Sequence, residues 1–205
     1  ENGYTFTNSH TPETINIEGT KTWNDTNDQD GKRPGKITVN LLADGDIYAP
    51  KEVTEADGWK YNFTDLPKYK NGNKITYTIT EDTVEDYQTL VNGYDITNSY
   101  TPGKTSVSVT KTWDDADNQD GKRARNIKVR LLADGNVVAD SEVDLSDANN
   151  WSHTWSDLDI NKNGSPIEYT VEEITSVEGY ATVITGSAKT GYIIKNSYTP
   201  ETTSI

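Results

Sequence analysis

The chain carries one block of sequence twice, and this duplication constrains its fold more than any other feature. The repeated motifs, in chain order, are KTW at 21–23 and 111–113, DGKR at 30–33 and 120–123, LLADG at 41–45 and 131–135, and NSYTP at 98–102 and 196–200. Motifs that recur in the same order indicate tandem copies of one structural unit. The sequence therefore predicts two domains of the same fold, over residues 14–102 and 103–200.

A third, partial copy of the motif leads the chain. Residues 3–12 (GYTFTNSHTP) are similar to the end of each domain and not to its beginning. We therefore interpret residues 1–13 as the last-strand remnant of a preceding repeat with its linker, and residues 201–205 as the linker to the next repeat. Asn8 takes the position of Asn98 but has no matching lysine, so we expect Asn8 to remain an ordinary amide within this chain.

Composition excludes several classes of function. The net charge of −14 and a pI near 4.5 argue against nucleic acid or an anionic membrane as a partner, because phosphate binding needs a basic surface. No apolar run is long enough to span a bilayer, so we expect no membrane segment in this fragment. The absence of Cys excludes disulfides and cysteine nucleophiles, and we expect no cofactor. An extracellular chain of this kind needs another covalent staple.

Alternating apolar and polar residues predict strands almost throughout. The runs Lys36–Leu41 and Asn126–Leu131 alternate in this way, and Asp-Gly and Asn-Gly turns separate such runs at intervals typical of a β-sandwich. No stretch sustains a helical stripe. The chain is therefore predicted to be all-β, with each domain a small sandwich of two sheets.

Three polar residues in each domain fall on the apolar face of a predicted strand. In the first domain they are Lys21, Glu81 and Asn98. The apolar residues that share these faces are Ile15, Ile17 and Trp23 for the lysine, Tyr77 and Ile79 for the glutamate, and Tyr94, Ile96 and Tyr100 for the asparagine. The second domain repeats the pattern with Lys111, Glu173 and Asn196.

The chemistry of this set points to a cross-link. Burial favours the neutral amine of lysine and the protonated acid of glutamate, because a low dielectric disfavours both charges. A neutral amine can attack the carboxamide of asparagine while the glutamate polarises the carbonyl and transfers protons, so that ammonia leaves. The residues alone also allow a plainer interpretation, in which a lysine at the rim extends to solvent or forms an ordinary ion pair.

The motifs also resemble a known family. VTKTW, NQDGKR, LLADG, YTVEE and NSYTPETTSI closely resemble the Cna B-type repeats of staphylococcal collagen adhesins, over essentially the whole chain. The resemblance implies an inverse immunoglobulin-like sandwich with a self-generated isopeptide bond between its first and last strands, assisted by an acidic residue. Residue by residue, it implies Lys21, Glu81 and Asn98 in one domain and Lys111, Glu173 and Asn196 in the other.

The resemblance also implies a biological role. It suggests an extracellular stalk that lies between adjacent B repeats and projects a ligand-binding region, elsewhere in the parent protein, from the Gram-positive cell wall. The reaction would consume its own residues, so a turnover enzyme is not expected. The alternative is an adhesive module that itself recognises a host matrix protein or glycan, and saturable binding of the isolated chain to such a ligand would favour it.

Other candidate sites are weaker. The loop at residues 25–31 is similar to a calcium loop, but no register combines Gly at its sixth position with an acid at its twelfth, so an acidic turn capped by Lys32 and Arg33 is favoured and no metal site is predicted. His10 and His153 have no partners at metal-binding or catalytic spacing. Three tryptophans near predicted turns, Trp59, Trp151 and Trp155, are expected to pack in the core or on a hairpin and not to form a ligand platform.

Overall fold

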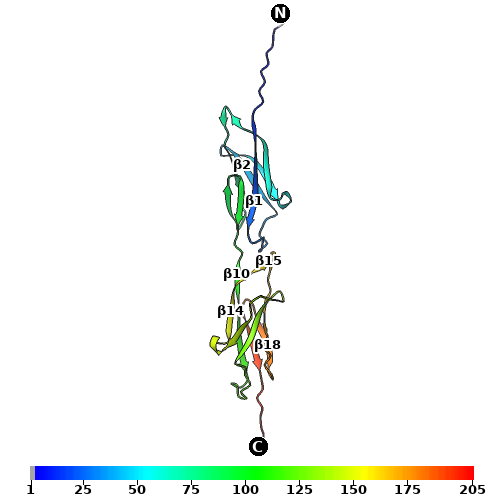
Figure 1. Ribbon diagram of the computed structural model, residues 1–205, viewed down its shortest axis with the longest axis vertical. Helices are drawn as coiled ribbons and strands as arrows, with labels where there is room; N and C mark the ends of the chain where they lie inside the picture. The colour runs from blue at the N-terminus through cyan, green and yellow to red at the C-terminus, as the bar shows by residue number, and fades with distance from the viewer. Residues whose placement is uncertain (1–2) are drawn as a thin grey trace. The chain divides into compact units, whose positions relative to one another are not determined.

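The computed structural model describes residues 3–205, which form two compact all-β units (Figure 1). The first unit ends at Thr101 and the second spans Pro102–Ile205. Each unit contains two larger sheets, a separate two-stranded hairpin and one short 3-10 turn. The prediction of two tandem immunoglobulin-like sandwiches is confirmed, whereas the exact extents 14–102 and 103–200 stay a prediction.

The first unit has a four-stranded sheet in the order β4-β1-β9-β8 and a three-stranded sheet in the order β3-β2-β7. Its elements are β1 (Thr14–Asn24), β2 (Lys36–Ala43), β3 (Asp46–Thr54), η1 (Glu55–Asp57), β4 (Lys60–Pro67), β5 (Tyr69–Lys70), β6 (Asn73–Lys74), β7 (Tyr77–Glu81), β8 (Gln88–Asn92) and β9 (Asp95–Ser99).

The second unit repeats this plan with the sheets β14-β10-β19-β18 and β12-β11-β13, in which β17 also pairs with β11. Its elements are β10 (Lys104–Asp114), β11 (Asn126–Ala133), β12 (Asn136–Val137), β13 (Val143–Ser146), η2 (Asp147–Asn149), β14 (Ser152–Asp159), β15 (Asn161–Lys162), β16 (Ser165–Pro166), β17 (Tyr169–Glu173), β18 (Ala181–Ser187) and β19 (Gly191–Ser197).

The first and last strands of each unit lie side by side and run parallel. In the first unit β1 pairs with β9, and Trp23 is the register partner of Asn98. In the second unit β10 pairs with β19, and Trp113 is the partner of Asn196. The other pairings within the two sandwiches are antiparallel. This pairing brings the first and last strands of each unit together within one sheet.

The strand pattern places one face of the central strands in the core. Along β2, the alternate residues Ile37, Val39 and Leu41 are 4%, 0% and 0% exposed, while their neighbours are only partly covered. Side chains of successive strand residues point to opposite faces, so this alternation is what an amphipathic strand gives when one face packs on a second sheet. Each unit has its own hydrophobic core.

The units differ in the edge strand that pairs with β2 in the first unit and with β11 in the second. In the first unit β3 is continuous, with a register shift between Leu41 and Leu42 of its partner strand. In the second unit the same edge is divided into β12 and β13, and Ser141 lies in the gap. Its buried hydroxyl contacts the backbone N–H and C=O of Leu131, each at 3.2 Å, which replaces the ladder bonds lost at the break.

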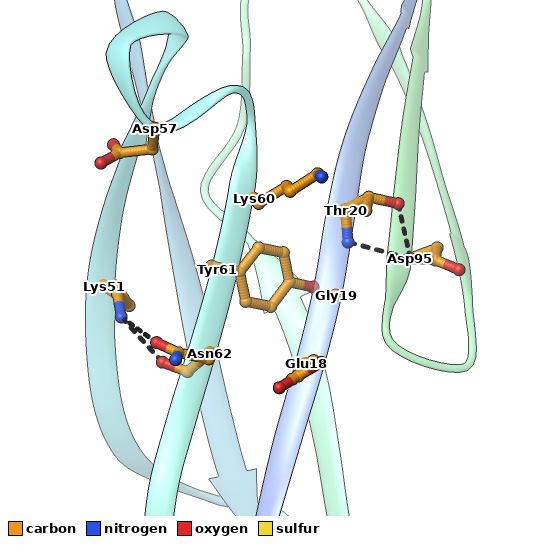
Figure 2. Close-up of a pocket in the computed structure, with 9 residues that line it drawn as sticks. All are labelled: Glu18, Gly19, Thr20, Lys51, Asp57, Lys60, Tyr61, Asn62 and Asp95. Atoms are coloured by element: carbon orange, nitrogen blue, oxygen red, sulfur yellow. Dashed lines mark hydrogen bonds between the residues drawn. The ribbon is translucent and has the colours of Figure 1, made fainter.

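A close approach in the first unit requires a glycine in β1. Figure 2 shows the Tyr61 ring lying against Gly19 beside an open groove, with Thr20 and Asp95 bonded across the neighbouring strand pair. The Tyr61 hydroxyl donates a hydrogen bond to the carbonyl of Tyr94. A Cβ atom on Gly19 would lie 2.0 Å from that carbonyl oxygen and 2.6 Å from the tyrosine ring. No side chain larger than hydrogen fits there without movement of the backbone.

We predict that Gly19→Ala lowers the stability of the first domain by about 1–3 kcal/mol, because added volume in a packed site forces backbone shifts. Gly35→Ala is the matched control, since its Cβ would meet nothing within 4 Å. Calorimetric unfolding of both variants beside the parent chain measures the effect. Equal transition temperatures for the two variants would contradict the assignment.

Candidate functional site

Lys21 and Asn98 are placed together by the parallel pairing of β1 and β9. Lys21 is 4% exposed and Asn98 is 0% exposed, although both are polar. The register pairs Lys21 with Ile96, so Asn98 lies two residues further along the neighbouring strand and on the same inward face. Such diagonal neighbours are within reach of a long side chain. The predicted inward placement of both residues is confirmed.

Glu81 reaches the same region from the opposite sheet. It ends β7, which pairs with β2 and not with β1 or β9. Its Oε1 lies 3.2 Å from the Lys21 Nζ, and both side chains are fully buried. The sandwich thus brings a lysine and a glutamate from different sheets into contact in its core.

The second domain links all three side chains through the carboxylate of Glu173. The Lys111 Nζ lies 3.0 Å from the Glu173 Oε2, and the Asn196 Nδ2 donates a hydrogen bond to the Glu173 Oε1 at 2.8 Å. One carboxylate therefore touches the amine on one oxygen and the carboxamide on the other. The six residues that the sequence singled out form two buried sites of the same composition.

The glutamate is held differently in the two domains. The Glu81 Oε2 accepts a hydrogen bond at 2.9 Å from the hydroxyl of Thr89, the register partner of Asn98 on β8. Within residues 3–205, neither the Nδ2 nor the Oδ1 of Asn98 has a hydrogen-bond partner, and the Oδ1 of Asn196 has none either. A buried polar group left unpaired costs about 1–3 kcal/mol. Both asparagines therefore sit in the core in an unfavourable state as free carboxamides.

Burial decides the protonation of the lysine. It lowers the pKa of Lys21 from 10.5 to about 8, against the opposing charge of Glu81, and burial likewise lowers the pKa of Lys111. The Lys21 Nζ also lies 4.0 Å from the centroid of the Trp23 ring. That contact favours the ammonium by about 0.5–2 kcal/mol, whereas desolvation of a buried ion costs several kcal/mol. Desolvation is the larger effect, so the amine form becomes accessible near neutral pH.

A cluster that the sequence reasoning did not identify lies beside each site. Asp25, which is 1% exposed, forms a two-point ion pair with Arg33 at 2.7 and 3.0 Å and accepts a hydrogen bond from the Tyr87 hydroxyl at 2.9 Å. Capping of the turn by Arg33 is confirmed, but Lys32 pairs instead with Asp86. The repetition of Asp25 and Arg33 as Asp115 and Arg123 is the sequence signal that could have indicated this cluster. No spacing in the sequence indicates that Tyr87 joins it.

The other candidates have structural roles. No group of three or more potential metal ligands occurs among the described residues. Trp155 is buried and its indole N–H donates to the carbonyl of Ser141. Trp59 and Trp151 are partly buried, and each packs edge-on against Trp23 or Trp113 at the margin of its core. In the described part of the chain, no helix is long and apolar enough to cross a membrane.

The N-terminal segment that carries Asn8 forms no strand. Residues 3–13 have no regular secondary structure, and Asn8 is exposed. The aromatic residues Tyr4 and Phe6 are 93% and 91% exposed. Asn98 and Asn196 are fully buried at the matching place in their motifs. The expectation that Asn8 stays an ordinary amide remains a prediction.

Comparison with known proteins identifies the family. The sequence model of the Cna protein B-type domain matches residues 17–99 and 107–197, one match in each unit. The chain belongs to the Cna B-type domain family. It is 54% identical over 199 residues to a collagen adhesin of Staphylococcus aureus, a match that covers 97% of the chain but only 17% of that longer protein.

Two crystal structures of B repeats from the collagen-binding surface protein CNA of S. aureus are also similar. A single B repeat unit (B1) is 51% identical, with 92% of this chain and 100% of that chain covered and a TM-score of 0.46. A pair of B repeat units (B1B2) is 52% identical, with 93% and 51% covered and a TM-score of 0.48.

The depressed lysine pKa gives a test in a chain that cannot cross-link. In Asn98→Ala, Lys21 keeps its titratable amine, with a pKa of about 8 when folded and 10.5 as its ordinary value. The unfolded domain then binds more protons between these pH values, so the free energy of unfolding of the first domain should rise as the pH increases through this window.

Denaturant unfolding of the first domain across this pH range measures the effect. The double variant Lys21→Met with Asn98→Ala, which lacks the amine, is the control and should not show the rise. Parallel profiles for the two variants would contradict the assignment of a buried amine.

Proposed function

We propose that this chain is a structural spacer of a bacterial surface adhesin, stabilised in each domain by an autocatalytic Lys–Asn isopeptide bond. The bonds would join Lys21 to Asn98 and Lys111 to Asn196, with Glu81 and Glu173 as the proton-transferring acids. The contact of Glu173 with both Lys111 and Asn196 is the observation that carries the proposal. Family membership and the identity to a collagen adhesin support the surface role.

The proposed reaction balances within the three side chains. A proton passes from the lysine ammonium to the glutamate, and the neutral Nζ attacks the asparagine Cγ. The protonated glutamate polarises the carbonyl oxygen and then delivers a proton to the Nδ2. The Cγ–Nδ2 bond breaks and ammonia leaves, while the Nζ gives its second proton to the glutamate carboxylate. An amide then joins lysine to asparagine, and the glutamate is left neutral. Each bond forms once, so the chemistry is a maturation step of the protein and not a turnover activity.

The position of the bond suits a load-bearing part. It would join the first strand to the last, so tension that enters at one end of a domain would pass to the other without loading most of the sandwich. Closing the loop from Lys21 to Asn98 would also stabilise the fold by about 4.5 kcal/mol in the chain-entropy treatment used for disulfides. The chain has no cysteine for that purpose. We infer a stalk in an extracellular, cell-wall-anchored parent, between neighbouring B repeats and a ligand-binding region.

Intact mass under denaturing conditions tests the cross-links. The measured mass of the unaltered chain should be lower than the mass calculated from its sequence by two molecules of ammonia. For Lys21→Ala and for Lys111→Ala the deficit should be one molecule of ammonia. Glu173→Ala should prevent the loss of ammonia in the second domain only. Peptide mapping assigns each bond and shows whether Asn8 stays free. A mass equal to the sequence would contradict the proposed chemistry.

Single-molecule pulling tests the load-bearing role. With force applied at the two ends, the unaltered chain should lengthen little, because only residues outside the two closed loops can extend. The Lys111→Ala variant should show one additional unfolding step from the second domain, and the double lysine variant should show two. Full unfolding steps in the unaltered chain would contradict the role as an inextensible spacer.

A further inference from the structure

The cluster around Asp25, and its copy around Asp115, has no part in the reaction as written above. It nevertheless recurs at the same place in both domains, next to the tryptophan that follows the reactive lysine by two residues. Asp115 is 2% exposed, pairs with Arg123 at 2.6 and 3.0 Å, and accepts the Tyr180 hydroxyl at 2.8 Å. These distances match those around Asp25 to within 0.1 Å. We call each set of Asp, Arg and Tyr a clamp.

The arginine and tyrosine of each clamp pack around the tryptophan ring. The Trp113 ring has the Arg123 guanidinium carbon at 5.7 Å from its centroid, and Tyr180 packs edge-on against it at 5.3 Å. Trp151 packs on the same ring at 5.3 Å. Around Trp23 the corresponding distances are 5.6 Å to Arg33, 5.0 Å to Tyr87 and 5.2 Å to Trp59.

The tryptophan in turn covers the reactive amine. The Lys111 Nζ lies 4.4 Å from the Trp113 centroid, and the Lys21 Nζ lies 4.0 Å from the Trp23 centroid. Both indole N–H groups are buried without a hydrogen-bond partner in the described structure. A buried tryptophan usually finds such a partner. Here its position is set instead by packing between the clamp and the lysine.

The loop that carries the clamp is built at some conformational cost. Three successive non-glycine residues adopt left-handed backbone angles, with φ of +48°, +58° and +61° at Ala116, Asp117 and Asn118. The backbone N–H of Asn118 donates to the Asp115 Oδ1 at 3.0 Å, and the Asn118 Oδ1 accepts the N–H of Arg123 at 2.9 Å. The same turn in the first domain uses Asp28 in place of Asn118. The loop therefore folds back on itself, so that Arg123 pairs with Asp115 at its start.

We propose that the clamps are positioning residues for the cross-linking reaction, because they hold Trp23 and Trp113 over the lysine amines and keep water from them. This inference rests on the proposed isopeptide chemistry. Removing water makes the neutral amine accessible, and fixing the indole fixes the lysine side chain against its glutamate. Stability alone explains the clamp less well, since a buried ion pair is weak evidence for net stabilisation.

The charged groups near Lys111 are few. Glu173 contacts it from β17, and Arg123, which pairs with Asp115, lies 5.7 Å from the centroid of the Trp113 ring. Hydrogen bonds from Arg123 first, and from Tyr180, lower the pKa of Asp115 to about 2 despite its burial. The clamp is therefore a closed, permanently charged pair over the pH range in which the lysine changes state. It can set position without itself titrating.

The experiment follows ammonia loss in each domain of the full chain. The protein is made by cell-free translation, synthesis is stopped, samples are quenched in denaturant over time, and peptide mass mapping separates the two cross-links. The variants are Asp115→Asn, Trp113→Leu and Trp113→Phe, and the control is Asp120→Asn in the same loop, whose carboxylate bonds Tyr198 and Glu201 outside the clamp. The unaltered first domain is an internal reference in every molecule.

We expect Asp115→Asn and Trp113→Leu to slow cross-linking of the second domain by about 10-fold to 100-fold relative to the first, as misplacement of a reacting group does. Trp113→Phe, which keeps an aromatic ring over Lys111, and Asp120→Asn should react at close to the normal rate. In Trp113→Leu the rate should recover as the pH is raised, because a hydrated Lys111 needs higher pH to lose its proton.

Protease resistance of the second domain in the same time courses separates folding from chemistry. The inference is overturned if the folded clamp variants cross-link as fast as the control, or if their linking lags only as much as their folding does at every pH. If Trp113→Leu does not fold, Asp115→Asn decides by the same criteria. If the unaltered chain loses no ammonia in either domain, the proposed chemistry itself fails, and that result is distinct from a normal rate in the variants.

Discussion

The parallel pairing of the first strand with the last is the constraint on which the rest of each domain depends. It places Lys21 and Asn98 on adjacent strands with their side chains directed into one core. A link from β1 to its antiparallel neighbour β4 would not join the first strand of the fold to the last. The facing sheet then needs to contribute only one group, Glu81, for a complete set of amine, acid and carboxamide to be present.

The arrangement also explains why charged residues are tolerated in so small a core. A lysine and a glutamate removed from water are costly unless each is paired, and the sandwich pairs them with each other. Their burial depresses the lysine pKa, and the same burial leaves the asparagine amide short of partners. The unreacted core is therefore under-satisfied at the asparagine, whose free carboxamide the proposed bond would consume.

Much of this was accessible from sequence because strands have a period of two. Alternation alone placed Lys21, Glu81 and Asn98 on apolar faces, and duplication gave the second set. Alternation could not show which sheet each strand joins, so the contact of Glu173 with both partners required the structure. The clamp was missed for a related reason. Asp25 and Arg33 are close in sequence and recur, but Tyr87 joins them from across the fold, and no local pattern encodes such a meeting.

The proposed reactive set is drawn from three strands and both sheets, and this has a consequence for how a cross-linked domain would mature. Lysine is on the first strand, glutamate on the seventh and asparagine on the ninth of the first unit. The three strands come together in the native sandwich, so a bond between these residues would record that this sandwich had closed at least once. Such a bond acts as a ratchet: a domain that has passed through its native state can afterwards be strained or locally opened, but it cannot return to an open chain.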